Sequence, residues 1–205
     1  MNPKNKRHTD PALAETRRNQ VLCAAAECFK RKGYHGAGMA EISKTAGMSA
    51  GHIYNYFKSK DDIIESIIQR DMEETISLFQ EFEEQPGDLV TILVDGLDAG
   101  VERHTDTECK ALSLEMLSEA ARNEKIANLL QQADTQSRDR MRNLLVGERG
   151  SLKASTEREI NARIEVMFSM IGGLLLRRIL NPNIDKEGLL IALRPAMKTL
   201  LLPFE

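Results

Sequence analysis

Apolar residues recur at three- and four-residue steps along most of the chain, which is the spacing of one buried face of an α-helix. Near the amino terminus this spacing predicts a first helix from about residue 11 to residue 32. The apolar positions on its buried face are Val21, Leu22, Ala25 and Phe29. Gly33 should end this helix, because glycine readily adopts the left-handed conformation found at helix ends. The following stretch, "GYHGAG", predicts a turn.

Two short helices separated by Gly47 should follow. The first is expected over residues 39–46 and the second over about residues 50–56. Ser49 is a suitable N-cap for the second helix, since a serine hydroxyl can accept a hydrogen bond from an unpaired N–H of the first turn. This pair of helices is a candidate helix-turn-helix.

A long helix should begin after Ser59, which is followed three positions later by Asp62 in a variant of the capping box. The helix should run to Gln85, where Pro86 and Gly87 end it. Further helices are expected near residues 88–104, 108–122, 124–146, 156–180 and 186–201, with "GERGSLKAS" as a loop. Pro195 should kink or divide the last helix. Because long β-branched runs and Asn-Gly turns are missing from the sequence, the expected fold is all-α.

The second short helix should have an apolar back and a polar front. With Ile53 pointing inward, a step of about 100° per residue places Phe57 on the same side. The residues that point away are Gly51, His52, Tyr54 and Asn55. Such a front suits the major groove of DNA, where Asn55 can bond the edge of an adenine bidentately. Considered alone, His52 and Asn55 are equally compatible with ordinary solvated surface.

Charge is distributed unevenly along the chain, although the net charge is only -3. Residues 1–60 carry 11 Lys and Arg against 4 Asp and Glu, whereas residues 61–205 carry 17 against 27. The first part is therefore net +7 and the second part net -10. This asymmetry favours an amino-terminal module that binds a polyanion, but uneven surface charge without function would give the same totals.

The segment from Arg18 to Ile63 resembles the DNA-binding domain of the TetR family of repressors. The resemblance is carried by Ala25, Phe29, Gly33-Tyr34, Ile42, Ala46-Gly47-Met48-Ser49, Gly51, Ile53-Tyr54, Tyr56-Phe57 and Ser59-Lys60. It implies a three-helix helix-turn-helix domain at residues 14–70, a larger helical effector-binding and dimerisation domain at residues 71–205, and a flexible basic arm at residues 1–13. The implied DNA-binding residues are Ser49, Gly51, His52, Tyr54, Asn55, Tyr56 and Lys60, the last through phosphate.

The chain departs from the family where threonines often stand, since it has Gly38 and Met39 at those positions. Most sequence specificity is therefore expected from the second helix of the motif. The basic stretch from Lys4 to His8 is either a disordered tail or an arm for the minor groove. Arg17 and Arg18 are expected to meet phosphate.

The resemblance also implies a pocket for a small-molecule effector among the middle helices. Methionine adapts to varied ligand shapes, and several of the candidates are methionines. The candidate lining residues are Met72, Phe79, Cys109, Leu112, Glu115, Met116, Met141, Met167 and Met170. The apolar candidates are more often ordinary core residues, and Cys109 and Glu115 are candidates for polar contacts with the ligand.

The last two helices, with apolar faces over residues 165–180 and 186–201, are expected to pair with their copies in a homodimer. Two internal core helices are the alternative. A dimer also agrees with the physics of reading DNA, because one short helix contacts few bases and twofold proteins read palindromes. The helix from Ser59 to Gln85 belongs to both domains, so a ligand that tilts it should change the spacing of the two DNA-reading helices.

Other classes of protein fit the sequence less well. An enzyme would need convergent catalytic groups, and the four histidines lie in no recognisable catalytic motif. A helical adaptor that acts through a protein partner is the other alternative. No metal or cofactor is expected, because Cys-x-x-Cys and His-x3-His spacings are missing.

The sequence also predicts a cytoplasmic protein. Its polar start lacks a signal peptide, and its longest apolar runs are too short to span a bilayer. Three cysteines, Cys23, Cys28 and Cys109, are expected to be buried free thiols.

Overall fold

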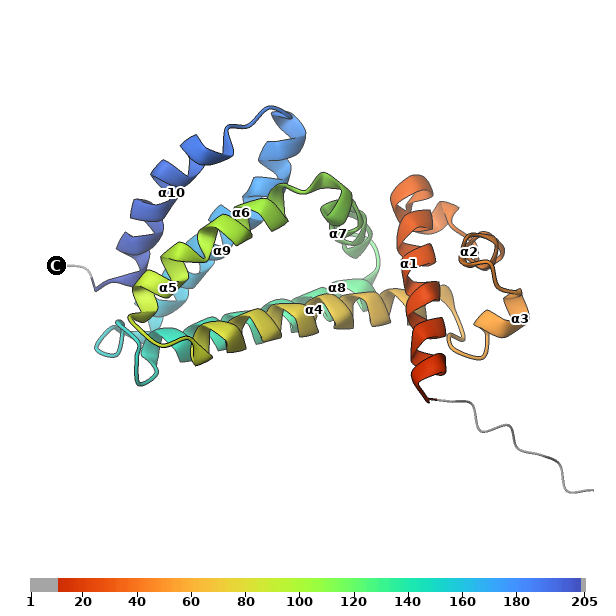
Figure 1. The fold of residues 1–205 in the computed structure, drawn as a ribbon, viewed down its shortest axis with the longest axis horizontal. Helices are drawn as coiled ribbons and strands as arrows, with labels where there is room; N and C mark the ends of the chain where they lie inside the picture. Colours follow the sequence, from red (N-terminus) through yellow and green to blue (C-terminus); the bar gives the residue numbers. More distant parts are fainter. Residues whose placement is uncertain (1–10, 204–205) are drawn as a thin grey trace, which may run out of the picture.

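The computed structural model describes residues 11–203, and of residues 107–111 it describes the backbone alone. Within this part the chain forms ten α-helices and no strand, which confirms the all-α prediction (Figure 1). The helices are α1 (Pro11–Gly36), α2 (Met39–Ala46), α3 (Ala50–Ile53), α4 (Lys60–Glu84), α5 (Leu89–Asp95), α6 (Leu97–Thr105), α7 (Thr107–Ala120), α8 (Glu124–Val146), α9 (Glu157–Leu180) and α10 (Lys186–Leu201). The basic stretch at Lys4 to His8 lies outside the described residues.

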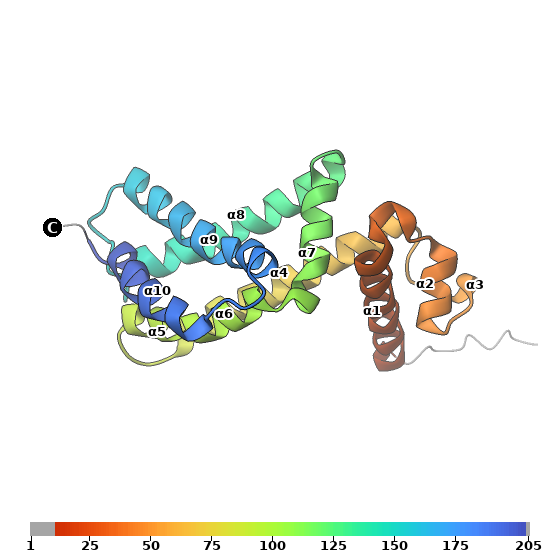
Figure 2. The same ribbon diagram turned by 90° about the horizontal axis from the view of Figure 1, so that it is seen from above.

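The molecule is elongated, with α1, α2 and α3 at one end and α5, α6, α9 and α10 at the other (Figure 1). Helices α4 and α8 pack against each other along the long axis. Helix α7 stands between the two ends and contacts α1, as both ribbon views show (Figure 2). The boundary expected at residue 70 falls inside α4, so one continuous helix belongs to both parts of the molecule.

Side-chain caps explain why most helices begin where the sequence predicts. Ser49 and Ser59 accept hydrogen bonds from the first turns of α3 and α4, which confirms both expected caps. Thr156 forms a complete capping box with Glu159 at the start of α9. Asp88, Asn123 and Asp185 cap α5, α8 and α10.

Gly33 adopts φ 72° and ψ 168° and interrupts α1 before its last turn. The left-handed φ suits glycine, which has no Cβ to oppose it. A Cβ at this position would also lie 3.1 Å from a carboxylate oxygen of Glu115 on α7. The main part of α1 therefore ends where the sequence predicts, and the bend brings α1 close to α7.

Two hydrophobic cores hold the fold. The amino-terminal core is built around Phe29, Ile42, Ile53 and Phe57, and it also receives Leu112, Met116 and Ile126 from α7 and α8. The second core lies between α4, α5, α6, α8, α9 and α10. Because α7 and α8 contribute to the first core, the helix-turn-helix is not packed from residues 14–70 alone.

The carboxyl end of α10 is fixed by a buried cation. Arg163 on α9 is only 3% exposed, and its Nη1 donates to the carbonyls of Leu200 and Leu202. These carbonyls lie at a helix end, where the backbone lacks intrahelical partners. The interaction joins the last two helices.

Three local expectations were wrong. The helix predicted over 88–104 is divided at Gly96, where a Cβ would lie 3.0 Å from the ring of Phe82, so close packing selects a glycine. Helix α10 continues through Pro195. Cys28 is buried as expected but Cys23 is exposed, and the side chain of Cys109 is not described.

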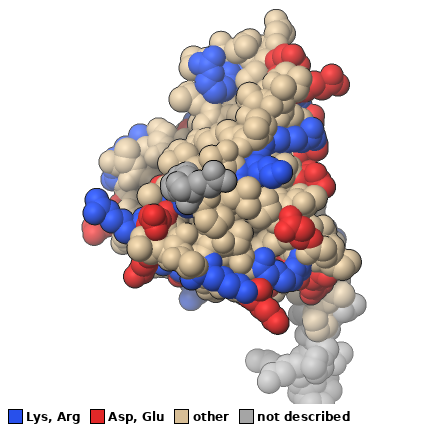
Figure 3. All heavy atoms as spheres, turned by 90° about the vertical axis from the view of Figure 1, so that its left-hand side faces the viewer, with Lys and Arg blue, Asp and Glu red and all other residues tan. Residues whose placement is uncertain are grey.

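The end of the molecule farthest from α3 carries both signs of charge (Figure 3). Uncharged residues cover the middle of this face, and Lys, Arg, Asp and Glu are interspersed around it. No helix in residues 11–203 combines the length and the apolar character needed to cross a bilayer.

Candidate nucleic-acid interface and ligand cavity

A tight turn joins α2 to α3. Gly47 has φ 63° and ψ 29° at the C-cap of α2, and its N–H donates to the backbone of the last turn. The hydroxyl of Ser43 donates to the carbonyl of Met48 across the same turn. The glycine thus allows the chain to reverse within three residues, and α2 and α3 form the predicted helix-turn-helix pair.

Helix α3 has the two faces that the helical angles predict. Ile53 is fully buried and Phe57 is 2% exposed, both in the amino-terminal core. On the other side, Gly51, His52 and Asn55 are exposed and Tyr54 is 52% exposed. The apolar back therefore anchors the helix while its polar front faces solvent.

The regular part of α3 is shorter than predicted, because it ends at Ile53 instead of residue 56. The N–H groups of Asn55 and Tyr56 donate three residues back, to His52 and Ile53, at 3.2 and 2.8 Å. Such bonds tighten the last turn of a helix. The tightening lets Phe57 enter the core just before Ser59 starts α4.

His52 and Tyr56 contact each other on the exposed side. Their ring centroids are 5.5 Å apart with an interplanar angle of 26°, and His52 Nε2 lies 3.3 Å from the Tyr56 hydroxyl. Tyr56 is half-buried, so it supports the imidazole from the side of the core. Two of the predicted DNA-facing side chains are thus stacked on each other.

Lys60 at the start of α4 is engaged within the fold. Its Nζ lies 4.1 Å from the centroid of the Tyr34 ring and donates to the Tyr34 carbonyl at 2.5 Å. The Tyr34 hydroxyl in turn donates to Asp61. Burial is the largest cause of the raised pKa of the Tyr34 phenol, and the hydrogen bond to Asp61 is the second. A phosphate contact by Lys60 remains a prediction, and it would compete with the contacts that Lys60 makes here.

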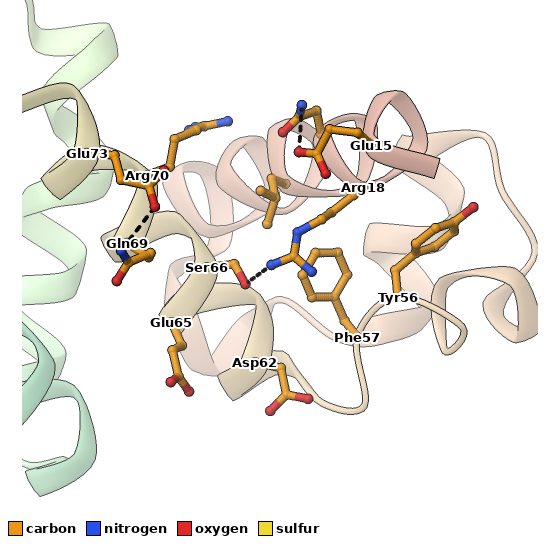
Figure 4. A pocket seen from close by; sticks show the side chains of 12 residues that line it. Glu15, Arg18, Tyr56, Phe57, Asp62, Glu65, Ser66, Gln69, Arg70 and Glu73 are labelled. Atoms are coloured by element: carbon orange, nitrogen blue, oxygen red, sulfur yellow. Dashed lines mark hydrogen bonds between the residues drawn. The ribbon is translucent and has the colours of Figure 1, made fainter. Parts of the chain in front are cut away.

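Arg18 supports α3 from behind. Its guanidinium lies 4.7 Å from the Phe57 ring centroid and donates to Ser66 on α4 at 2.7 Å (Figure 4). It sits in a groove of about 760 Å³ between α1 and α4 that also carries four carboxylates, from Glu15, Asp62, Glu65 and Glu73. A phosphate contact by Arg18 remains a prediction, and it would compete with the contacts that join α1 to Phe57 and to α4.

A second, largely apolar cavity of about 420 Å³ lies in the other half of the molecule. Its walls come from α4, α5, α6, α8, α9 and α10, together with Gly96 between α5 and α6. The lining residues are Thr75, Leu78, Phe79, Phe82, Leu93, Gly96, Leu97, Gly100, His104, Asp134, Ser137, Met141, Met167, Phe168, Ile171, Gly172, Met197 and Leu201. The size is in the range of sites for drug-sized ligands.

Three of the predicted lining residues, Phe79, Met141 and Met167, lie on the wall of this cavity. Leu112 and Met116 do not, because α7 turns them into the amino-terminal core. Met72 is half-buried and Met170 packs against the second core, and neither lines the cavity. Glu115 faces α1 instead, and the position of the Cys109 side chain is not described.

Aromatic rings and one histidine on the wall were missed by the sequence analysis. Phe82 lies one turn beyond Phe79 on α4, so helical spacing alone would have placed it on the same face. Phe168 follows Met167 directly, and His104 projects from α6. The spacing on α4 was a usable signal, whereas the contribution of α6 depends on how the helices pack.

Two carboxylates of α7 hold the end of α1. Glu115 Oε1 accepts a hydrogen bond from the Tyr34 N–H at 2.7 Å, next to the bend at Gly33. Glu119, whose side chain is 2% exposed, lies 3.0 Å from His35 Nε2 and 2.7 Å from Arg122. Helix α7 therefore gives the larger half of the molecule a direct contact with the helix-turn-helix domain.

Among the residues that the structure describes, no three His, Cys, Asp or Glu side chains are grouped so that they could hold a metal ion.

Comparison with known proteins agrees with this architecture. Residues 21–67 match the family model described as "Bacterial regulatory proteins, tetR family". The chain is 32% identical over 117 residues to the HTH-type transcriptional regulator UidR of Escherichia coli strain K12. That match covers 57% of this chain and 58% of UidR, so the chain spans less than two thirds of this curated relative.

Solved structures match over nearly the whole chain. Salmonella enterica GusR superposes with a TM-score of 0.73 and 24% identity, over 95% of this chain and 98% of that chain. The regulator FadR from Bacillus subtilis in complex with stearoyl-CoA gives a TM-score of 0.69 and 20% identity, over 90% of this chain and 97% of that chain. The family match therefore covers the helix-turn-helix at residues 21–67, and the solved structures show that the same fold surrounds it.

Proposed function

We propose that this chain is a ligand-responsive transcriptional regulator that binds a palindromic operator as a homodimer and is released by a small molecule. The observation that carries the proposal is α3, whose polar front is exposed while Ile53 and Phe57 anchor its back in the core. A helix held rigidly in this way can enter the major groove without rearranging. The relatives that the chain resembles are named as transcriptional regulators, which favours this function over an enzyme or an adaptor.

Around α3, Asn55 and His52 are assigned to base edges, and Tyr54 and Ser49 to the backbone of the DNA. Asn55 is exposed beside the His52–Tyr56 pair, and an amide can bond adenine at two atoms. Gly51 has no side chain, and a Cβ there would meet open space, so the backbone can approach the groove. Lys60 would reach phosphate only by leaving the Tyr34 carbonyl.

The dimer is assigned to the outer faces of α9 and α10. Large apolar side chains lie exposed on these two helices: Val166, Leu176, Ile179, Leu180 and Ile191 are between 44% and 77% exposed. Several large exposed apolar side chains on neighbouring helices are typical of protein interfaces. A twofold dimer would also supply the second copy of α3 that a palindromic site requires.

Ligand response is assigned to α4. Thr75, Phe79 and Phe82 on this helix line the apolar cavity, while Ile63 and Ile67 lie in the amino-terminal core. A ligand that favours one tilt of α4 would therefore change the distance between the two α3 helices of a dimer. Changing a mostly DNA-bound population to a mostly released one needs a differential affinity on the order of 5 kcal/mol. FadR, a neighbour in fold, binds stearoyl-CoA, which supports a ligand role for the corresponding half of this chain.

The experiment is selection of bound fragments from genomic DNA of the source organism, followed by binding titrations on the recovered site. We expect a palindromic site, two chains per site, and an affinity that falls steeply with salt, because phosphate contacts release counterions. Genes beside the site would suggest effectors to test. A chain that recovers no specific fragment, or binds DNA with no dependence on salt, would contradict the proposal.

A further inference from the structure

The wall of the cavity is predominantly apolar and aromatic. Eleven of its eighteen lining residues are Leu, Ile, Met or Phe, and three more are glycines. Phe79, Phe82 and Phe168 come from α4 and α9. A ligand must therefore have an apolar body, and aromatic rings can stack on these phenyl groups.

The polar groups on the wall offer mainly hydrogen-bond acceptors. The hydroxyl of Thr75 donates to the Asp71 carbonyl at 2.9 Å, and that of Ser137 donates to the Ala133 carbonyl at 3.0 Å. Because each hydroxyl has a single hydrogen, the oxygen that faces a ligand is left as an acceptor. The Nδ1 of His104 is likewise 2.9 Å from the Gly100 carbonyl on its own helix.

The wall offers no cationic side chain to an anion. No Lys or Arg occurs among the described residues that line the cavity, and Asp134 is the one carboxylate among them. Arg138 lies beside it, with Nε 2.9 Å from Asp134 and Nη1 2.5 Å from Glu165. The Asp134 side chain is 54% exposed, so solvent and its ion pair with Arg138 both screen its charge. An anionic ligand would find no cationic partner on these largely apolar walls, and burying an unpaired charge is costly.

We infer that the effector is an apolar, drug-sized molecule that carries a hydroxyl or amine as hydrogen-bond donor and bears no carboxylate, phosphate or sulfonate. The donor group faces Thr75, Ser137 and Asp134, and the apolar body lies against the phenylalanines. The term effector rests on the proposed function, whereas the preference for a neutral or cationic donor rests on the cavity alone. Ligands whose anionic group must enter the cavity are excluded by the same chemistry.

The test uses two fluorescent probes with one skeleton. N-phenyl-1-naphthylamine is neutral and has one N–H donor, and 8-anilino-1-naphthalenesulfonate adds a sulfonate to the same framework. Titration of the full chain without DNA should give a dissociation constant at least tenfold lower for the neutral probe. Equal affinities, or tighter binding of the sulfonate, at this cavity would overturn the inference.

Variants locate the binding. Gly100 lines the cavity and a Cβ there would meet open space, so Gly100→Leu should fill the cavity without displacing the backbone. It should raise the dissociation constant of the neutral probe at least tenfold, and its thermal midpoint should not fall, since leucine favours helix over glycine. Ala99→Leu, at the exposed neighbouring position on α6, is the control and should bind the probe as the unsubstituted chain does. Gly172→Leu repeats the test from α9.

Asp134→Asn tests the charge. Removing this carboxylate should reduce the ratio of the two probes' dissociation constants by several-fold, mainly because the sulfonate probe binds more tightly. A ratio that does not change, or neutral-probe binding that is unaffected by both glycine variants, would overturn the assignment to this cavity. If the probes behave as expected but no operator is found, the proposed function fails and the ligand chemistry stands. If an operator is found but the sulfonate probe binds more tightly than the neutral probe, the proposed function stands and the inferred ligand chemistry fails.

Discussion

The exposed side of the segment around α3 carries a stacked pair of side chains, His52 and Tyr56, and a separate amide, that of Asn55. His52 is stacked on Tyr56, so its imidazole is held in one place before DNA arrives. Asn55 is exposed next to this pair. Prior positioning of a side chain lowers the entropy lost when it makes a contact. We therefore assign His52 to fixing the register of the helix and Asn55 to discriminating one base pair.

Substitution of Asn55 by alanine should weaken binding to the selected operator by about 1–3 kcal/mol and relax preference at one base pair of each half-site. Binding to unrelated DNA should change little, since the amide contributes no phosphate charge. Competition titrations with operators varied at single positions measure both effects. Asn128→Ala, at an exposed position on α8, is the control. An equal loss on every DNA sequence would contradict the assigned role.

Tyr34 should make stability depend on alkaline pH. Burial and the hydrogen bond to Asp61 raise the pKa of its phenol above the ordinary value near 10. The folded state therefore favours the neutral phenol, and this contribution is complete below pH 10 and is lost as pH rises from there toward the folded pKa. We expect the stability advantage of the unsubstituted chain over Tyr34→Phe to be constant near neutral pH and to shrink above pH 10.

Urea unfolding at a series of pH values measures this advantage. Tyr54→Phe, at a tyrosine that is 52% exposed and lies outside the core, is the control and should differ little from the unsubstituted chain. An advantage of Tyr34 that persists undiminished well above pH 10 would rule out the linkage.

At the scale of elements, the sequence predicts helix starts better than it predicts helix neighbours. Asn123, Thr156 and Asp185 are local caps, so α8, α9 and α10 begin where periodicity and capping chemistry place them. The glycine at position 96, between α5 and α6, is required for a reason that lies elsewhere in the chain, namely the ring of Phe82. A cap is a property of four consecutive residues, whereas a packing constraint requires the tertiary structure.

The candidate sites follow the same rule. The faces of α3 are set by residues within one helix, and the sequence predicts them correctly. The cavity is made by six helices, and a buried methionine looks the same in a core as on a cavity wall. Leu112 and Met116 were assigned to the wrong region because nothing in α7 itself indicates that it packs on α1.

The continuity of α4 between the two cores should be required for response to a ligand. Glu73 is exposed and lies between Ile68 of the first core and Phe79 of the second. Glu73→Gly should loosen this stretch at a cost of about 1 kcal/mol, since glycine is a poor helix former. We expect DNA affinity without ligand to be nearly unchanged and the weakening caused by ligand to be reduced.

Operator titrations with and without a bound effector measure this loss. Glu83→Gly makes the same exchange at an exposed position beyond Phe82, outside the stretch that joins the cores, and should respond normally. If both variants respond as fully as the unsubstituted chain, α4 is not the connection, and the contacts of Glu115 and Glu119 with α1 become the alternative route.

At the scale of the whole molecule, α3 lies at one end of a long axis and the cavity lies in the other half (Figure 1). Helices α4 and α7 both join these parts, through the shared cores and through the carboxylates of α7. An elongated protomer of this kind converts a small tilt at one end into a larger displacement at the other. This displacement changes DNA binding only if two protomers are held together, because the α3 helix of a single protomer could move with its half-site.

Dimerisation through α9 and α10 can be tested by placing one charged side chain in the proposed interface. Ile191 is 77% exposed in the protomer, and Ile191→Glu would place an unpaired carboxylate in the proposed interface, at a cost on the order of 3 kcal/mol. Light scattering should then find the 23.0 kDa protomer where the unsubstituted chain gives roughly twice that mass. Operator affinity should fall at least tenfold, while helix content stays the same. Leu117→Glu, at a 60% exposed position on α7, controls for adding a charge to apolar surface and should remain a dimer. A dimer that survives Ile191→Glu unchanged would place the interface on another face, and the tilt of α4 would then have to be related to a different twofold axis.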